Sequence, residues 1–266
     1  PQEGALRGGH IPGAVNVPLL EFPARYLAEG ATLIPADKNV VVASYLGGDG
    51  NMASLLINAV RITDPSNSGA YPWSKTVMMG MQTWTFDKTL ANGHRYPDDL
   101  GVTRIEAATE ATVNTGGSFG QPTFSGVDRT AVGEAILQRA VEYFRGYTNQ
   151  FDLQTTPLAL KTNFDNGNPN DDPQVLSVRG AADYAKGHVP TAVNVPWKNT
   201  AELTQLAVLD PQKPVVVYCY TGHTGTLATM ALGILGYDAT NMMYGMCGWN
   251  PVSAVNAAQL QKFDLK

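Results

Sequence analysis

The chain has 266 residues, of which 44% are hydrophobic and 15% are charged, and its formal net charge at pH 7 is −5. This length suffices for two domains of ordinary size, and a mildly acidic chain has no positive field that would attract nucleic acid. The longest apolar runs, such as residues 39–43 and 214–219, are strand-sized and far shorter than the roughly 20 residues that span a bilayer. We therefore expect a soluble globular protein without a membrane span or a nucleic-acid partner.

Three sequence blocks mark residues 1–90. They are GHIPGAVNVP at 9–18, the apolar run and loop VVVASYLG at 40–47, and GMQTW at 80–84. Strand-like and helix-like patterns alternate through this region, which is typical of a parallel sheet covered by helices. We therefore predict an α/β domain over residues 1–90.

Residues 91–153 share none of these blocks and are predicted to form an insert between two domains. The stretch 115–120 is rich in Gly, Ser and Thr and indicates a loop. Residues 130–146 carry apolar side chains on overlapping turns, which predicts one long helix. We expect this helix to pack between the domains.

A second exposed loop is predicted at residues 163–173, which are dense in Asn, Asp, Gly and Pro. The loop lacks the ordered ligand spacing of a calcium site, and the chain has only two cysteines. The sequence therefore predicts no metal site, no other cofactor and no disulfide framework.

The three blocks return in the same order in residues 154–266, as GHVPTAVNVP at 187–196, VVVYCYTG at 215–222 and GMCGW at 245–249. Three matched blocks mean two copies of one module. The second copy also has a buried-strand pattern at 174–179, and nothing equivalent precedes Gly9. We therefore predict two tandem α/β modules, the first of which lacks its leading strand and exposes an unpaired sheet edge.

A thiol distinguishes the two copies, because Cys219 stands where the first copy has Ser44. Cys219 lies between a strand-like run and a predicted helix at 224–235, so the backbone N–H groups that follow it can point at its sulfur as an anion cradle. This environment favours a nucleophilic thiolate, whereas a free cysteine elsewhere is more often a small buried hydrophobe. The sequence thus predicts a catalytic Cys219 with a cradle formed by Tyr220, Thr221, Gly222, His223 and Thr224.

Two histidines near this chemistry receive different interpretations. His223 is either a general acid or base or a polar loop residue, since its ordinary pKa lies near neutrality. His188 is expected to be structural, because His10 occupies the same place in the copy without the thiol. Together with Asn194 it is expected to form a hydrogen-bonded corner that leads into the next strand.

Cys247 is a candidate second thiol in the last block. If the strands before Cys219 and Cys247 are neighbours, Cys247 can resolve a persulfide or sulfenate on Cys219. The alternative is a small residue tolerated in a tight turn. Ser44 cannot carry a persulfide and has only Asp49 near it as a base, so the first module is expected to be inert.

The segments GHVP at 187–190 and CYTGHT at 219–224, in this order and at this separation, resemble the rhodanese sulfurtransferases. The resemblance extends over most of residues 1–90 and 174–255. It implies a five-stranded parallel sheet in each module and a cysteine that takes up sulfane sulfur as a persulfide and passes it on. In two-domain members only the C-terminal module usually carries this cysteine, which implies a catalytic domain at 154–266.

The chain departs from the best-known members of that family at two places. Basic residues beside the cysteine, which hold thiosulfate, are replaced here by Tyr220, Thr221 and His223. This favours a polysulfide or protein persulfide over thiosulfate as the donor. Arg179 lacks the aspartate with which it usually pairs, because position 177 is Ser.

Phosphatases of the related type need an arginine six positions after the cysteine, where this chain has Gly225, so phosphoryl transfer is not expected.

We therefore predict a sulfurtransferase that passes sulfane sulfur from thiosulfate or polysulfide, through a Cys219 persulfide, to a thiol, a cyanide-like acceptor or a protein. The alternatives are a non-catalytic sulfur carrier or protein-binding module, and dithiol redox chemistry through Cys219 and Cys247. Low lysine content, abundant Asn, Thr, Gly and Tyr, and a start without Met favour an exported, periplasmic or extracellular protein over a cytoplasmic one.

Overall fold

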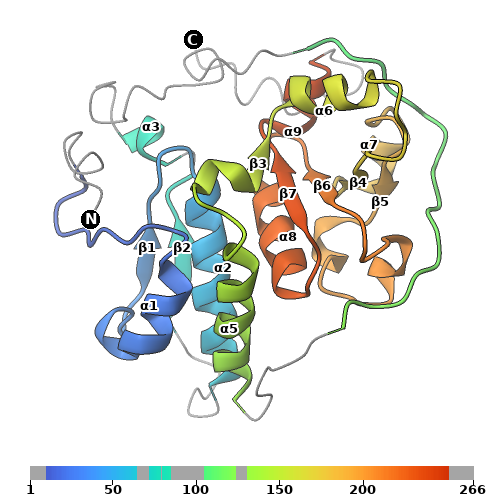
Figure 1. Ribbon diagram of the computed structural model, residues 1–266. Coiled ribbons are helices and arrows are strands. Elements are labelled where there is room, and N and C mark those ends of the chain that lie inside the picture. The colour runs from blue at the N-terminus through green and yellow to red at the C-terminus, as the bar shows by residue number, and fades with distance from the viewer. Residues whose placement is uncertain (1–9, 65–71, 79, 85–104, 124–130, 252–266) are drawn as a thin grey trace. The chain divides into compact units, whose positions relative to one another are not determined.

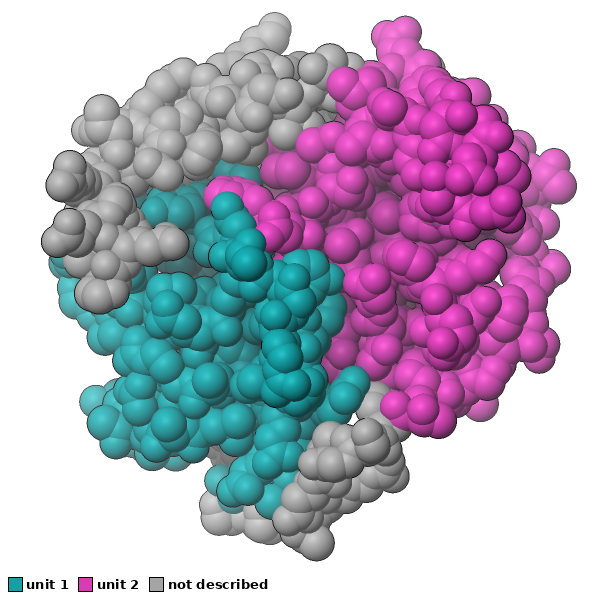
Figure 2. All heavy atoms as spheres, in the orientation of Figure 1, with its two compact units in different colours: residues 1–101, 125–150 teal, residues 102–124, 151–266 magenta. Residues whose placement is uncertain are grey.

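The computed structural model describes residues 10–64, 72–78, 80–84, 105–123 and 131–251. The chain forms two compact units, which are coloured separately in Figure 2. Unit 1 comprises residues 1–101 and 125–150, and unit 2 comprises residues 102–124 and 151–266. No helix in the described part of the chain combines the length and apolar character that a bilayer crossing requires.

Unit 1 contains a short parallel sheet with helices (Figure 1). The alternation of strand and helix matches the predicted α/β pattern. Its described elements are α1 (Phe22–Glu29), η2 (Gly30–Thr32), β1 (Val40–Val42), α2 (Gly48–Thr63), β2 (Ser74–Thr76), α3 (Met81–Trp84) and α5 (Val132–Phe144).

Helix α5 is the long helix predicted within residues 130–146, and it belongs to unit 1. It packs against α1 and α2. Its buried side chains Leu137, Ala140 and Phe144 recur at the three- and four-residue spacing that places them on one face. The helix therefore contributes to the core of one unit and is not part of a separate insert.

One edge of the small sheet differs from its counterpart in unit 2. Among the described residues β1 pairs only with β2, in parallel register. Val41 on β1 is 66% exposed, whereas Val216, which matches it in the repeat, is 6% exposed. Residues 1–9 lie outside the described residues, so the absence of a leading strand stays a prediction.

Unit 2 is built on a five-stranded parallel sheet with the order β3-β7-β6-β4-β5. This confirms the predicted parallel α/β sheet for the second module. Its described elements are η3 (Gln150–Leu153, which begins at the last residue of unit 1), β3 (Gln154–Thr155), α6 (Pro157–Phe164), β4 (Gln174–Ser177), α7 (Ala181–Tyr184), β5 (Val193–Asn194), η4 (Trp197–Asn199), η5 (Gln205–Val208), β6 (Val215–Tyr218), α8 (His223–Ile234), β7 (Ala239–Met242) and α9 (Gly245–Trp249).

The core of unit 2 lies on both faces of this sheet. Val215 and Val217 of β6 belong to one buried cluster with α8, while Val216 and Tyr218 belong to another with α6, α7 and α9. Successive side chains of a strand point to opposite faces, so β6 must be apolar throughout. Figure 1 shows the helices that cover the sheet. This burial makes β6 a rigid base for the residue that follows it.

Residues 105–123 form an extended strap along unit 2, drawn in green in Figure 1. Ala107 donates its N–H to the carbonyl of Trp249 and is buried in the core, and Glu110 pairs with His188 in an antiparallel bridge. Farther along, Phe119 donates its N–H to the carbonyl of Ala207. The units therefore differ from the predicted boundaries 1–90, 91–153 and 154–266, because residues 91–153 are divided between both units.

Residues 163–173 begin within α6 and continue as the exposed loop that was predicted. The side chains of Asn166 and Asn168 donate hydrogen bonds to the Asp171 carboxylate at 3.1 and 3.0 Å. Three polar side chains of the loop, those of Asn166, Asn168 and Asp171, therefore bond to one another.

Candidate active site

Cys219 directly follows β6 and is 1% exposed. Its sulfur accepts a hydrogen bond from the backbone N–H of Gly222 at 3.1 Å. Gly222 is the N-cap of α8 and has φ +92°, a left-handed conformation that glycine adopts without the steric cost of a Cβ. The turn therefore brings a helix N-terminus and a donor to the thiol, which is an arrangement that stabilises negative charge on sulfur.

Helix α9 holds the same loop from the neighbouring strand end. Met246 donates its N–H to the carbonyl of Cys219 at 2.8 Å, and Cys247 donates its N–H to the carbonyl of Tyr220 at 2.9 Å. Gly245 makes this approach possible, since an added Cβ would lie 2.4 Å from the Cys219 carbonyl oxygen. Sequence reasoning did not single out Gly245, although its retention as Gly80 in the first copy was the available signal.

The predicted cradle residues contribute unequally. Among the contacts described for them, Gly222 donates to the sulfur, and Thr221 Oγ1 lies 3.4 Å from Nδ1 of His223. The Tyr220 hydroxyl instead donates to the carboxylate of Asp183 on α7. The side chain of Tyr220 is therefore bound to another helix, and its predicted role in the cradle rests on its backbone N–H.

Arg179 lies close to the loop but is completely buried. Its guanidinium donates to the carbonyl oxygens of Gly187 at 2.8 Å and Asp183 at 2.6 Å, and its Cζ lies 5.2 Å from the centre of the Tyr220 ring. Backbone carbonyls thus take the place of the missing aspartate at position 177. The described chain from Cys219 to Pro251 contains no Lys or Arg, so the loop itself supplies neither an ammonium nor a guanidinium group.

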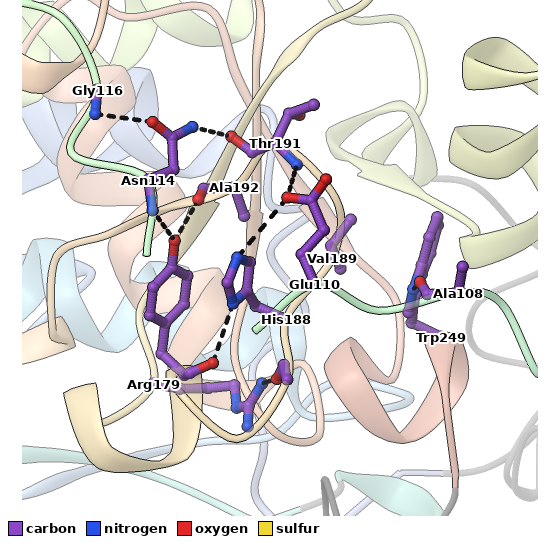
Figure 3. Close-up of polar contacts among 12 residues, drawn as sticks. Ala108, Glu110, Asn114, Gly116, Arg179, His188, Val189, Thr191, Ala192 and Trp249 are labelled. Atoms are coloured by element: carbon purple, nitrogen blue, oxygen red, sulfur yellow. Dashed lines mark hydrogen bonds and ion pairs between the residues drawn. The ribbon is translucent and has the colours of Figure 1, made fainter. Parts of the chain in front are cut away.

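His188 is buried in a hydrogen-bonded corner, part of which Figure 3 shows. Its Nδ1 lies 3.0 Å from the carbonyl oxygen of Tyr184, which can only accept, so Nδ1 carries the proton. The ring stacks on Tyr184 with 3.8 Å between centroids, and its Nε2 lies 3.9 Å from the Glu110 carboxylate. Nearby, Asn194 donates to the carbonyl oxygens of Ser177 and Arg179 at 2.9 Å each. These contacts agree with a structural role for His188.

The strands that precede the two cysteines are neighbours, as predicted, because β6 and β7 are adjacent and parallel. Neither Cys219 nor Cys247 forms a disulfide bond in the described part of the chain, and both are buried. They lie in segments joined by consecutive backbone hydrogen bonds, so the main chains of the two segments are close together. The role of Cys247 as a resolving thiol stays a prediction.

The loop around Ser44 in unit 1 repeats the geometry of the Cys219 loop. Ser44 Oγ accepts from the N–H groups of Gly47 at 3.0 Å and Gly50 at 3.1 Å. Gly47 has φ +90°, and Met81 donates its N–H to the Ser44 carbonyl at 2.8 Å, which matches the bond from Met246. The two loops thus share a left-handed glycine turn and the start of a helix. They also share a backbone hydrogen bond to the carbonyl of the central residue, which we call the backbone clamp. They differ in the central atom, which is oxygen in Ser44 and sulfur in Cys219.

Asp49 is expected to make unit 1 sensitive to pH, since burial raises the pKa of its carboxyl from 3.8 to about 6. The folded state then binds the proton more tightly than the unfolded state, so stability falls as pH rises from about 4 to about 6. We expect Asp49→Asn to raise the free energy of unfolding at pH 7 by about 1–3 kcal/mol and to flatten its pH dependence.

Urea denaturation across this pH range checks the expectation for Asp49. The exposed Asp37→Asn serves as the matched control and is expected to change little. An Asp49→Asn protein with the same pH dependence as the parent would contradict the expectation.

Unit 2 is an α/β domain in which a buried parallel sheet presents the Cys219 thiol at a strand–turn–helix junction. Comparison with protein families identifies such a domain, because residues 156–251 match the model of the rhodanese-like domain. The chain therefore contains a rhodanese-like domain within unit 2. No curated protein matches the chain.

Several solved structures are similar to part of the chain. A rhodanese-like domain protein from Staphylococcus aureus is 24% identical, with a TM-score of 0.33, over 36% of this chain and 89% of that chain. The BH2092 protein from Bacillus halodurans is 23% identical, with a TM-score of 0.37, over 47% of this chain and 98% of that chain. CoADR-RHD from Bacillus anthracis is 16% identical, with a TM-score of 0.32, over 50% of this chain and 21% of that chain.

Proposed function

We propose that this protein is a sulfurtransferase in which Cys219 carries sulfane sulfur as a persulfide. The observation that carries the proposal is the 3.1 Å hydrogen bond from the Gly222 N–H to the Cys219 sulfur at the start of α8. A backbone donor and a helix N-terminus stabilise a thiolate before attack and the anionic persulfide after it. The rhodanese-like domain at residues 156–251 supports the same chemistry.

The proposed reaction has two displacement steps. The Cys219 thiolate attacks the outer sulfur of the donor, a new S–S bond forms, and the donor S–S bond breaks so that its remainder leaves with the electron pair. A thiolate or cyanide then attacks the outer sulfur of the persulfide, and the Cys219 thiolate departs in its original state. The sulfane sulfur changes partner in each step, so no external oxidant or reductant is needed.

We propose polysulfide or a protein persulfide as the preferred donor, with thiosulfate as a weaker one. The support is the absence of Lys and Arg from Cys219 to Pro251. The –SO₃ head of thiosulfate, which concentrates charge on three oxygens, would have to rest on backbone N–H groups, hydroxyls and one imidazole. These compensate charge less fully than ammonium or guanidinium groups.

Incubation with thiosulfate or polysulfide, followed by intact-mass measurement and peptide mapping, tests the proposed function. We expect one added sulfur atom on Cys219, its removal by cyanide or dithiothreitol, and repeated turnover. Failure of every donor to add sulfur would exclude the function. Single loading of Cys219 without turnover would support the alternative, a sulfur carrier that serves a protein partner.

We further propose that unit 1 is a non-catalytic copy of the rhodanese-like module. Its support is the shared loop geometry at Ser44, including the left-handed glycine and the backbone clamp from Met81. A hydroxyl at the centre of that loop cannot store sulfane sulfur. Donor treatment is therefore expected to add no sulfur to any peptide of residues 1–90.

We also propose that the protein is exported, on the basis of its low lysine content and abundant Asn, Thr, Gly and Tyr. Fractionation of cells that produce the natural protein tests this location. Recovery of the protein only in the cytoplasm would contradict it.

A further inference from the structure

Tyr220, the residue directly after the thiol, connects the Cys219 loop to α7 through its side chain. Its hydroxyl donates to Oδ2 of Asp183 at 2.5 Å and accepts from the backbone N–H of Gly180 at 3.3 Å. Gly180 is the N-cap of α7 and Asp183 lies in its first turn. The phenol oxygen of Tyr220 therefore has two partners at the start of α7. In sequence, Asp183 is 37 residues and Gly180 is 40 residues from Tyr220.

The carboxylate that receives this hydrogen bond is itself held in place. Lys186 Nζ lies 2.7 Å from Oδ1 of Asp183, and the buried Arg179 donates to the Asp183 carbonyl at 2.6 Å. The hydrogen bond from Lys186 first, and that from Tyr220 second, lower the pKa of Asp183. Burial, and then the hydrogen bond to Asp183, raise the pKa of Tyr220. At neutral pH the phenol donates and the carboxylate accepts, which gives a charge-assisted hydrogen bond.

The backbone of Tyr220 is held by a different helix, because its carbonyl accepts the N–H of Cys247 on α9. Tyr220 is thus fixed to α7 through its side chain and to α9 through its main chain. It belongs to the short turn from Cys219 to Gly222 that the hydrogen bond to the sulfur closes. A displacement of Tyr220 is therefore expected to change the alignment of that donor with the thiol.

We infer that Tyr220 and Asp183 form a positioning pair that holds the Cys219 loop in the geometry required for a reactive thiolate. The inference deepens the proposed function, on which its catalytic meaning rests. Neither side chain is assigned contact with the substrate. The phenol is engaged by Asp183, so its contribution passes through the conformation of the loop.

Tyr220→Phe tests the pair with the smallest change, since it keeps the ring over Arg179 and removes both hydrogen bonds of the hydroxyl. We expect alkylation of Cys219 by iodoacetamide at neutral pH to slow by about 5- to 20-fold and its pH–rate profile to move to higher pH. Peptide mapping follows Cys219 and Cys247 separately, so the rate at Cys247 reports any general loosening of the fold.

Asp183→Ala provides the second arm, because it removes the acceptor at a partly exposed position without disturbing the ring. It is expected to slow alkylation of Cys219 in the same direction as Tyr220→Phe and by no more, since the hydroxyl keeps its bond from the Gly180 N–H. The double variant is expected to be no slower than Tyr220→Phe alone, since the bond between hydroxyl and carboxylate is already absent from that variant. Lys161→Gln is the matched control, because it removes an exposed ion pair of the same kind, that with Asp165 after α6, and is expected to leave the pH–rate profile of Cys219 unchanged.

Two results would overturn the pair. One is a folded Tyr220→Phe or Asp183→Ala protein whose Cys219 reacts at the parental rate or faster with the parental pH profile; the other is fully additive effects in the double variant. The alkylation measurement needs no sulfur donor, so it stays decisive even if the protein transfers no sulfur. Failure of the proposed function would appear separately, as the absence of a persulfide on the parental Cys219 with every donor.

Discussion

Cys219→Ser is expected to lower sulfur transfer by at least about 1,000-fold while the protein stays folded. Activity is lost because a hydroxyl cannot accept and release sulfane sulfur as a thiolate does. The fold is kept because unit 1 already accommodates serine in this setting, where Ser44 Oγ accepts two backbone N–H groups at 3.0 and 3.1 Å. Steady-state transfer from polysulfide to cyanide, with circular dichroism and thermal unfolding, measures both parts of this expectation.

Cys247→Ser is the matched control for that experiment, since it removes the other thiol of the chain. A single-cysteine mechanism predicts that this variant keeps most of its activity. An equal loss in Cys247→Ser would favour the dithiol alternative. Full activity in Cys219→Ser would exclude Cys219 as the sulfur carrier.

Gly245→Ala is expected to have the second-largest effect, on both stability and activity. An added Cβ would lie 2.4 Å from the carbonyl oxygen of Cys219 and 3.0 Å from the Gly222 nitrogen, and both neighbours are backbone atoms that cannot rotate away. Gly245 also has φ +51°, a conformation that strains alanine. We expect the free energy of unfolding to fall by about 2–4 kcal/mol and the alkylation rate of Cys219 to drop at least tenfold, because the loop must move.

Gly80→Ala is the matched control, since Gly80 approaches the Ser44 carbonyl in unit 1 as Gly245 approaches that of Cys219. It is expected to destabilise unit 1 without slowing the chemistry at Cys219. Gly120→Ala, where no heavy atom lies within 4 Å of the added Cβ, is expected to change neither property. Unchanged stability and reactivity in Gly245→Ala would contradict the described clamp.

Local patterns in the sequence predicted the elements around the thiol well. The helix expected over residues 224–235 is α8, His223–Ile234, and the strand expected to end before Cys219 is β6. Both predictions depend on short-range patterns: a β-branched run that is buried on both faces, and apolar residues repeated at helical spacing. Such patterns are determined by residues close together in the chain.

The strap at 105–123 was not predicted, because nothing in its own composition indicates where it binds. Its attachment uses backbone groups, such as the N–H of Ala107 and that of Phe119, which every residue except proline possesses. Sequence patterns report side chains, so an extended segment bound through its main chain resembles an ordinary loop. Only the three-dimensional structure places it on unit 2.

The sequence by itself determined the parallel α/β character of unit 2, the position of Cys219 at a strand–turn–helix junction and the difference from Ser44, since each depends on local pattern or on internal repetition. Only the tertiary structure decided that the Tyr220 phenol bonds to Asp183, that α9 clamps the loop through Met246 and that residues 91–153 are shared between two units. The physical reason is distance along the chain. These contacts join segments tens of residues apart, and their partners become neighbours only after the sheet has assembled.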